Sequence, residues 1–171
     1  MQQFDGQVAL VTGGGAGIGR ATCLRFASAG AAVVVAELNE ETGAQTAADI
    51  VKAGGNSLFV QTDVSDESSV AAMVGAVTDA YGRIDILVNN AAIFVLKGID
   101  ATVDDWQQIL GVNVIGTALV AKHAVPEMRK VGGGAIINLA SISSFVAQPK
   151  CVTYNATKAA VANMTRCMAL D

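Results

Sequence analysis

Charged residues are scarce in this sequence. They make up 15% of the 171 residues, against roughly 25% in an ordinary soluble domain. Hydrophobic residues make up 52%, so the chain lacks the low hydrophobicity and high charge of a disordered segment. The 11 Lys and Arg are outnumbered by 15 Asp and Glu, which gives a net charge of −4. This balance argues against nucleic-acid binding by a broad basic surface, because phosphate contacts need clustered Lys and Arg.

Cysteine is also rare. The three cysteines, Cys23, Cys151 and Cys167, form no CxxC pair, which argues against a disulfide framework and against a cysteine-based metal site. The N-terminal sequence carries Asp5 and lacks the basic segment of a secretory signal. The longest uncharged stretch, residues 131–149, is interrupted by glycines and serines, whereas a membrane span needs about 20 mostly apolar residues. We therefore expect a cytoplasmic protein without a metal site or a membrane partner.

Apolar runs and helical patterns alternate along the chain. Short apolar runs bounded by glycines and polar residues predict strands, and 3.6-residue periodicity predicts helices. Such alternation is typical of βαβ units and a parallel sheet. We predict one domain over residues 1–171 with a Rossmann-type, doubly wound α/β fold. The expected strands are 7–11, 32–36, 57–61, 84–88 and 135–139, and the expected helices are 18–29, 40–52, 66–81, 102–130 and 152–170.

A glycine cluster, TGGGAGIG, directly follows the first expected strand and opens the first expected helix. The spacing is G-x-x-x-G-x-G at Gly13, Gly17 and Gly19, and it matches neither G-x-G-x-x-G nor a P-loop. Glycines allow a tight turn and close approach of a pyrophosphate, and the helix N-terminus offers free N–H groups to it. The alternative is a glycine-rich turn that only allows close packing of helix and strand.

Two carboxylates follow the next strands. Glu37, at the end of the second strand, can accept hydrogen bonds from the adenosine ribose hydroxyls and would repel a 2′-phosphate. This favours NAD over NADP, although Glu37 can also be read as a solvated residue at a strand end. Asp63, after the third strand, could meet the adenine edge or serve as an ordinary turn aspartate.

Tyr154 and Lys158 are separated by one helical turn and share a face of the last expected helix. An ammonium beside a phenol favours the phenolate form, which suits a tyrosine for general acid–base work. Ser141 falls at the end of the fifth strand, where its hydroxyl could hydrogen-bond a substrate carbonyl or alcohol. Taken alone, the Tyr–Lys spacing also fits a surface pair.

Together these segments resemble the short-chain dehydrogenase/reductase family, from residue 7 onward. The matching segments occur in the family's order: TGGGAGIG at 12–19, Thr62-Asp63-Val64, Asn89-Asn90-Ala91-Ala92, Asn113 within NVIGT, Ser141, and Tyr154 to Lys158. One departure is Ala92, where the family usually has glycine. A larger one is the end at Asp171, since the family normally continues with further strands. We therefore expect a domain truncated at its C-terminal end.

The resemblance implies an NAD-dependent oxidoreductase that transfers a hydride between the cofactor and a secondary alcohol or ketone. Tyr154 would be the general acid/base, Lys158 would hold the nicotinamide ribose, and Ser141 would orient the substrate oxygen. Asn113 would anchor a water in a proton relay from Lys158. The implied cofactor-binding residues are Gly13, Gly17, Ile18, Gly19, Glu37, Asp63, Val64, Asn90, Ala91, Tyr154 and Lys158.

The expected partners are a small-molecule substrate and further copies of the chain. Phe94, Val95 and Leu96, with Phe145, Val146 and Gln148, suggest a pocket for an apolar, uncharged alcohol or carbonyl. The last helix is apolar nearly all round, which predicts burial on several sides and, together with the family resemblance, a homo-oligomer (dimer or tetramer). The alternative function is an NAD-binding module without catalysis, such as a sensor, a scaffold or a truncated inactive form.

Overall fold

The computed structural model describes residues 2–171. Its strands form one sheet in the order β3-β2-β1-β4-β5, with every neighbouring pair parallel. The strands are β1 Val8–Thr12, β2 Ala32–Glu37, β3 Asn56–Gln61, β4 Ile86–Asn89 and β5 Ala135–Asn138. The main helices are α1 Gly17–Ser28, α2 Glu40–Lys52, α3 Glu67–Tyr81, α4 Val103–Leu110, α5 Thr117–Lys130 and α6 Val152–Met168. The predicted doubly wound α/β fold is confirmed.

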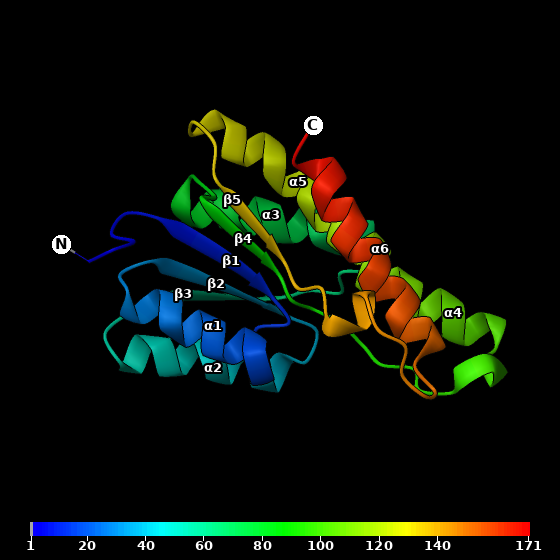
Figure 1. The fold of residues 1–171 in the computed structure, drawn as a ribbon. Coiled ribbons are helices and arrows are strands. Elements are labelled where there is room, and N and C mark those ends of the chain that lie inside the picture. Colours follow the sequence, from blue (N-terminus) through cyan, green and yellow to red (C-terminus); the bar gives the residue numbers. More distant parts are fainter. Residues whose placement is uncertain (1) are drawn as a thin grey trace.

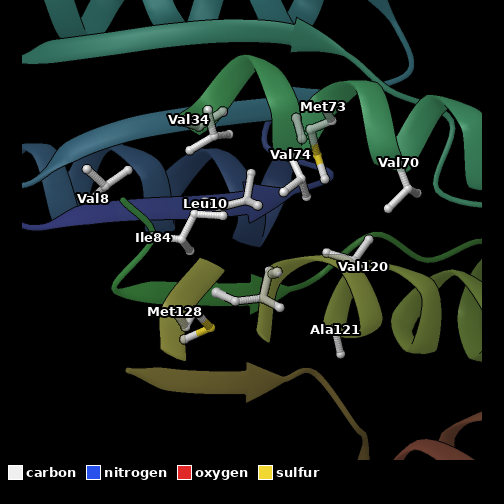
Figure 2. Packing of buried hydrophobic residues seen from close by; sticks show 14 of the residues in the cluster. Val8, Leu10, Val34, Val70, Met73, Val74, Ile84, Val120, Ala121 and Met128 are labelled. Carbon is white, nitrogen blue, oxygen red and sulfur yellow. The ribbon is translucent and has the colours of Figure 1, made fainter. Parts of the chain in front are cut away.

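Helices cover both faces of the sheet (Figure 1). On one face, Val11 of β1 packs in a cluster with Cys23 of α1 and with residues of α2. On the other face, Leu10 of β1 packs in a larger cluster that contains Met73 of α3 and Val120 of α5 (Figure 2). Neighbouring residues of β1 thus point to opposite faces, and both faces are buried. This explains why β1 and β2 are continuous apolar runs rather than alternating ones.

The strand order places the ligand-binding edge of the sheet. The chain runs outward from β1 through β2 to β3, and then returns to add β4 on the other side of β1. The connections after β1 and β4 therefore separate at the carboxyl ends of two adjacent strands. This is a topological switch point, the position at which open α/β sheets bind their ligands.

The predicted long helix over residues 102–130 is present as a continuous helical stretch from Val103 to Lys130, but its middle is a π helix rather than an α-helix. α4 passes into a π-helical segment, Gly111–Gly116, before α5 begins. A π turn widens the helix locally and is frequent at functional sites. Asn113 lies in this turn and is buried. Its side chain forms hydrogen bonds with the backbone of Ile93, and sequence periodicity cannot reveal such a contact.

The fourth strand begins at Ile86, later than the predicted residue 84. Asp85, just before it, accepts a hydrogen bond from the backbone N–H of Val8 at 2.8 Å through its carboxylate. Its own N–H donates to the Val8 carbonyl at 3.0 Å. The Asp85 side chain thus takes the place of a backbone acceptor for Val8 at the amino end of the sheet. Regular pairing between β1 and β4 begins one residue later.

The continuous helical stretch Val103–Lys130 is long and apolar enough to cross a membrane by length and composition. Within it, Val120 and Ala124 are fully buried against the sheet and α3. The core helix of a soluble protein passes the same test, so this stretch is weak evidence for a membrane span.

Candidate active site

One cleft of about 540 Å³ lies at the carboxyl edge of the sheet. It is lined by the loop of residues 13–19 after β1, called the glycine loop below, by residues that end or follow β2, β3, β4 and β5, and by two residues of α6. Most of the predicted site residues meet there. Its lining residues include Gly13, Gly17, Ile18, Glu37, Asp63, Val64, Asn90, Ala91, Tyr154 and Lys158.

The glycine loop needs its glycines for two different reasons. A Cβ on Gly13 would lie 2.9 Å from the Ala91 Cα, and a Cβ on Gly19 would collide with the carbonyl of Gly13. These two glycines allow the loop to pack closely on itself and on the segment after β4. Gly17 has a φ of +51° and open space where its side chain would be. It therefore leaves the cleft clear beside the start of α1.

The N-terminus of α1 has the features of an anion site. Its N-cap residue, Ala16, has no side chain that could accept a hydrogen bond from the first turn. The first backbone N–H groups of a helix have no partner within the helix, and they carry the positive end of its dipole. Because Gly17 and Ile18 line the cleft, this end of α1 fits a bound pyrophosphate.

Glu37 lies at the end of β2 and lines the same cleft. One carboxylate oxygen accepts from the N–H of Gly15 at 3.0 Å, and the other accepts from the N–H of Asn39 at 3.1 Å. The side chain is therefore held in place by the glycine loop. The reading of Glu37 as a merely solvated strand-end residue does not fit these contacts.

Asp63 makes the hydrogen bonds of a turn aspartate and also lines the cleft. Its Oδ1 accepts from the N–H and the hydroxyl of Ser65, at 2.9 and 2.6 Å, which is the hydrogen bonding of an ordinary turn aspartate. It also lines the cleft, next to Val64. Val64 packs closely on the backbone of Gly116 in the π turn.

Asn90 clamps the glycine loop. Its Nδ2 donates to the carbonyls of Thr12, at 2.9 Å, and Gly13, at 3.1 Å. The Thr12 hydroxyl in turn accepts from the backbone N–H groups of Asn90 and Ala91, both at 3.1 Å. Sequence reasoning did not assign Thr12 any role. The only available signal was its position at the junction of the strand and the glycines.

Tyr154 and Lys158 project from α6 into the cleft, with the Lys158 Nζ 5.8 Å from the centre of the Tyr154 ring. Lys158 is 5% exposed, and its Nζ donates to the carbonyl of Leu139 at 2.6 Å. Burial lowers the pKa of Lys158 below its usual value. The Tyr154 ring stacks on the ring of Phe94, with 4.4 Å between their centres. The alternative of a solvent-exposed surface pair is therefore wrong.

Ser141 follows β5 and caps the short helical turn Ile142–Ser144. Its Oγ accepts from the N–H of Ser143 at 3.1 Å. A hydroxyl carries one hydrogen besides its lone pairs, so this contact leaves the Ser141 O–H able to donate. Within residues 2–171, no hydrogen bond joins Ser141 to Tyr154 or Lys158, and the cleft lining next to it is formed by Leu139 and Ala140.

Asn113 lies behind the cleft lining and is 1% exposed. Its Oδ1 accepts from the N–H of Ile93 at 2.8 Å, and its Nδ2 donates to the Ile93 carbonyl at 3.0 Å. The same Nδ2 lies 3.1 Å from the hydroxyl oxygen of Thr157, to which it donates. Asn113 thus joins the π turn, the segment after β4 and α6. Its predicted role in a water relay stays a prediction.

The fold and the site define a dinucleotide-binding α/β protein whose cleft carries a tyrosine and a lysine. The sequence profile of the short chain dehydrogenase family matches residues 7–171. The chain therefore belongs to this family of oxidoreductases, as predicted.

Curated relatives match nearly the whole chain. A short chain dehydrogenase/reductase, astE, of Aspergillus oryzae is 46% identical over 98% of this chain and 66% of its own length. Meso-2,3-butanediol dehydrogenase of Serratia marcescens is 39% identical over 99% of this chain and 66% of its own length. The chain thus spans about two thirds of the length of these relatives.

Solved structures agree with the fold. A short chain dehydrogenase/reductase from Burkholderia phymatum, in complex with NAD, superposes with a TM-score of 0.94 at 34% identity, covering 98% of this chain and 60% of that one. A 7α-hydroxysteroid dehydrogenase, complexed with NADH and 7-oxo glycochenodeoxycholic acid, superposes with a TM-score of 0.95 at 33% identity, covering 98% and 66%.

Proposed function

We propose that the protein catalyses the reversible, NAD-dependent oxidation of a secondary alcohol to a ketone. The balanced reaction is R2CHOH + NAD+ giving R2CO, NADH and H+. The observation that carries the proposal is that one cleft holds the uncapped start of α1 and Glu37 together with Tyr154 and Lys158. The first pair suits a dinucleotide, and the second suits proton transfer at an alcohol oxygen.

The residues fit NAD. The first turn of α1 would hold the pyrophosphate. Glu37 would accept hydrogen bonds from the ribose hydroxyls of the adenosine half. Asp63 and Val64 would flank the adenine. The glycine loop and Ala91 would lie along the middle of the cofactor, and Lys158 would donate to the nicotinamide ribose. The nicotinamide supplies or accepts the hydride. Both structures described above contain this cofactor in its oxidised or reduced form.

Tyr154 acts as the general acid/base in this proposal. In alcohol oxidation its phenolate takes the hydroxyl proton as the hydride leaves carbon, and in ketone reduction its phenol returns a proton. The Lys158 ammonium stabilises the phenolate through its charge, an interaction that is stronger in a cleft shielded from water. Ser141 donates its hydroxyl hydrogen to the substrate oxygen, and Asn113 anchors the water that passes the proton from Lys158 to solvent.

An apolar, uncharged substrate fits the surroundings of Tyr154. The segments on either side of the tyrosine expose large apolar side chains, namely Phe94, Leu96, Ile142, Phe145 and Val146. Relatives named for their substrates act on cyclic alcohols in several cases, such as the 2,5-dichloro-2,5-cyclohexadiene-1,4-diol dehydrogenase LinX of Sphingobium indicum, 39% identical over 99% of this chain and 68% of its own length. We therefore place alicyclic secondary alcohols first in the substrate panel.

The proposal is tested by assaying the intact protein with NAD+ and a panel of secondary alcohols, following NADH absorbance. Tyr154→Phe should lower turnover by about 10²–10⁴-fold, the usual contribution of general acid–base catalysis, while NADH affinity, measured by fluorescence titration, stays nearly unchanged. Tyr81→Phe is the matched control, because the Tyr81 hydroxyl bonds to Asn56, outside the cleft. Full activity of Tyr154→Phe would remove Tyr154 from its role.

The same assay separates the alternative function. A wild-type protein that binds NADH tightly but turns over no alcohol or ketone in the panel would be an NAD-binding module rather than an enzyme.

The exposed side of α6 is relevant to assembly. In the described part of the chain, residues 2–171, the buried residues of α6 all lie on one side of the helix, namely Thr153, Thr157, Lys158 and Val161. The first half of the helix exposes Val152, Ala156 and Ala159, and Asn163 and Arg166 are exposed further on. The apolar first half supports a homo-oligomer in which a second copy covers this surface. A cytoplasmic location agrees with the sparse, unpaired cysteines.

A further inference from the structure

Thr153, immediately before Tyr154, is a fully buried threonine with a long-range hydrogen bond. Its hydroxyl donates to the carbonyl of Val95 at 2.6 Å. Val95 belongs to the segment after β4 and is itself buried. Thr153 is the second residue of α6. A threonine near a helix start usually bonds within its own turn, whereas this one reaches a residue 58 positions away in sequence.

The segment after β4, to which Thr153 bonds, also contains Phe94, and Phe94 contacts Tyr154. Phe94 stacks on Tyr154, with 4.4 Å between the ring centres and 23° between the ring planes. The residues on either side of Phe94 are both fixed: Ile93 by the Asn113 amide and Val95 by Thr153. Yet Phe94 as a whole residue is 63% exposed. Its position therefore depends on its backbone neighbours rather than on enclosure by a core.

We propose that Thr153 is a positioning residue, which holds Phe94 over the ring of Tyr154 through its bond to the Val95 carbonyl. The proposal rests on the function proposed above, since it assigns Thr153 to the alignment of the reacting phenol. Without the hydroxyl, the buried Val95 carbonyl loses its partner and the segment after β4 can shift. A shift of about 1 Å in a group that positions a reaction can lower turnover by as much as about 100-fold.

The first arm of the test measures the stack itself and needs no turnover. The Phe94 ring current displaces the NMR resonances of the Tyr154 ring, which are identified in the intact protein by their loss in Tyr154→Phe. Thr153→Val has nearly the shape of threonine but no hydroxyl, and it should lose most of this displacement. Thr153→Ser should keep it. Thr78→Val is the matched control, because the Thr78 hydroxyl donates within its own helix, α3, to the Gly75 carbonyl.

The second arm measures kinetics in the same variants. Thr153→Val should lower kcat by about 10- to 100-fold with little change in NADH affinity, and Thr153→Ser should restore most of it. Thr78→Val should match the wild type. Where Thr153→Val does not fold, Thr153→Ala is used with the same expectations, because it introduces no larger side chain.

Together the NMR and kinetic measurements distinguish failure of the positioning role of Thr153 from failure of the proposed enzymatic function. A Thr153→Val protein that keeps the displaced Tyr154 resonances overturns the positioning role, whatever the protein does as an enzyme. Unchanged kcat in Thr153→Val, with an active wild type, also overturns it. An inactive wild type that binds NADH contradicts the proposed function and with it the role of Thr153 in alignment, and the NMR arm then still decides whether the contact holds the stack.

Discussion

The backbone N–H of Gly15 donates to the Glu37 carboxylate at 3.0 Å, so a single side chain ties the glycine loop to the end of β2. The second oxygen of Glu37 is held by Asn39. The carboxylate is thus fixed in the cleft before any ligand arrives. A fixed negative charge discriminates more strongly than a mobile one, because it cannot move away from a 2′-phosphate without breaking two hydrogen bonds.

Glu37→Gln should therefore weaken the preference for NAD over NADP. Glutamine removes the charge but keeps an oxygen that can accept from Gly15. Like charges facing each other cost on the order of 1.4 kcal/mol or more, which is about 10-fold in binding. We expect the ratio of kcat/KM for NAD to that for NADP to fall by about this factor. Glu40→Gln, an exposed charge on α2, is the control, and an unchanged ratio in Glu37→Gln would refute the assignment.

The glycines of the chain should respond to alanine in opposite directions. At Gly19 an added Cβ would meet the Gly13 carbonyl and the Asn90 amide, so Gly19→Ala should lose about 1–3 kcal/mol of stability and bind NADH less tightly. At Gly75, inside α3, a Cβ would meet nothing within 4 Å. Gly75→Ala should gain about 0.5–1 kcal/mol. Urea unfolding of both variants measures this, and a stabilised Gly19→Ala would contradict the packing argument.

Local patterns were enough to predict much of this structure. The expected strands match the observed ones within a few residues, since β1 and β2 are apolar runs bounded by glycine and polar residues. The helix 66–81 is bounded as predicted by Asp66, whose side chain caps it, and by Gly82 at a φ of +69°. The glycine cluster could be placed at the ligand edge because it follows a strand of a parallel sheet, whereas Tyr154 and Lys158, which lie on a helix, were assigned to the cofactor by the family resemblance.

The remaining features depend on partners distant in sequence. The Asn90 amide acts on Thr12 and Gly13, 78 and 77 positions away, so its role as a clamp on the loop could not be predicted. The π turn covers only six residues, too few to show in the sequence pattern, and the bonds of Asn113 within it reach Ile93, 20 positions away. Thr153 resembles any other threonine near a helix start until the Val95 carbonyl is known to face it.

Asp85 should make stability depend on pH at the end of the sheet opposite the cleft. Burial acts to raise the pKa of Asp85, but the hydrogen bonds from Arg83 and from the Val8 N–H, with the Arg83 charge, outweigh it and leave the pKa below its usual value. Its stabilising effect is therefore present above about pH 4, the unfolded value, and is lost as the pH falls through the lower folded value. Asp85→Asn should cost about 1–3 kcal/mol at pH 7, and this difference should shrink in strongly acidic buffer. Urea unfolding across pH measures it, with the exposed Asp79→Asn as control, and a difference that does not change with pH would contradict the ionic role.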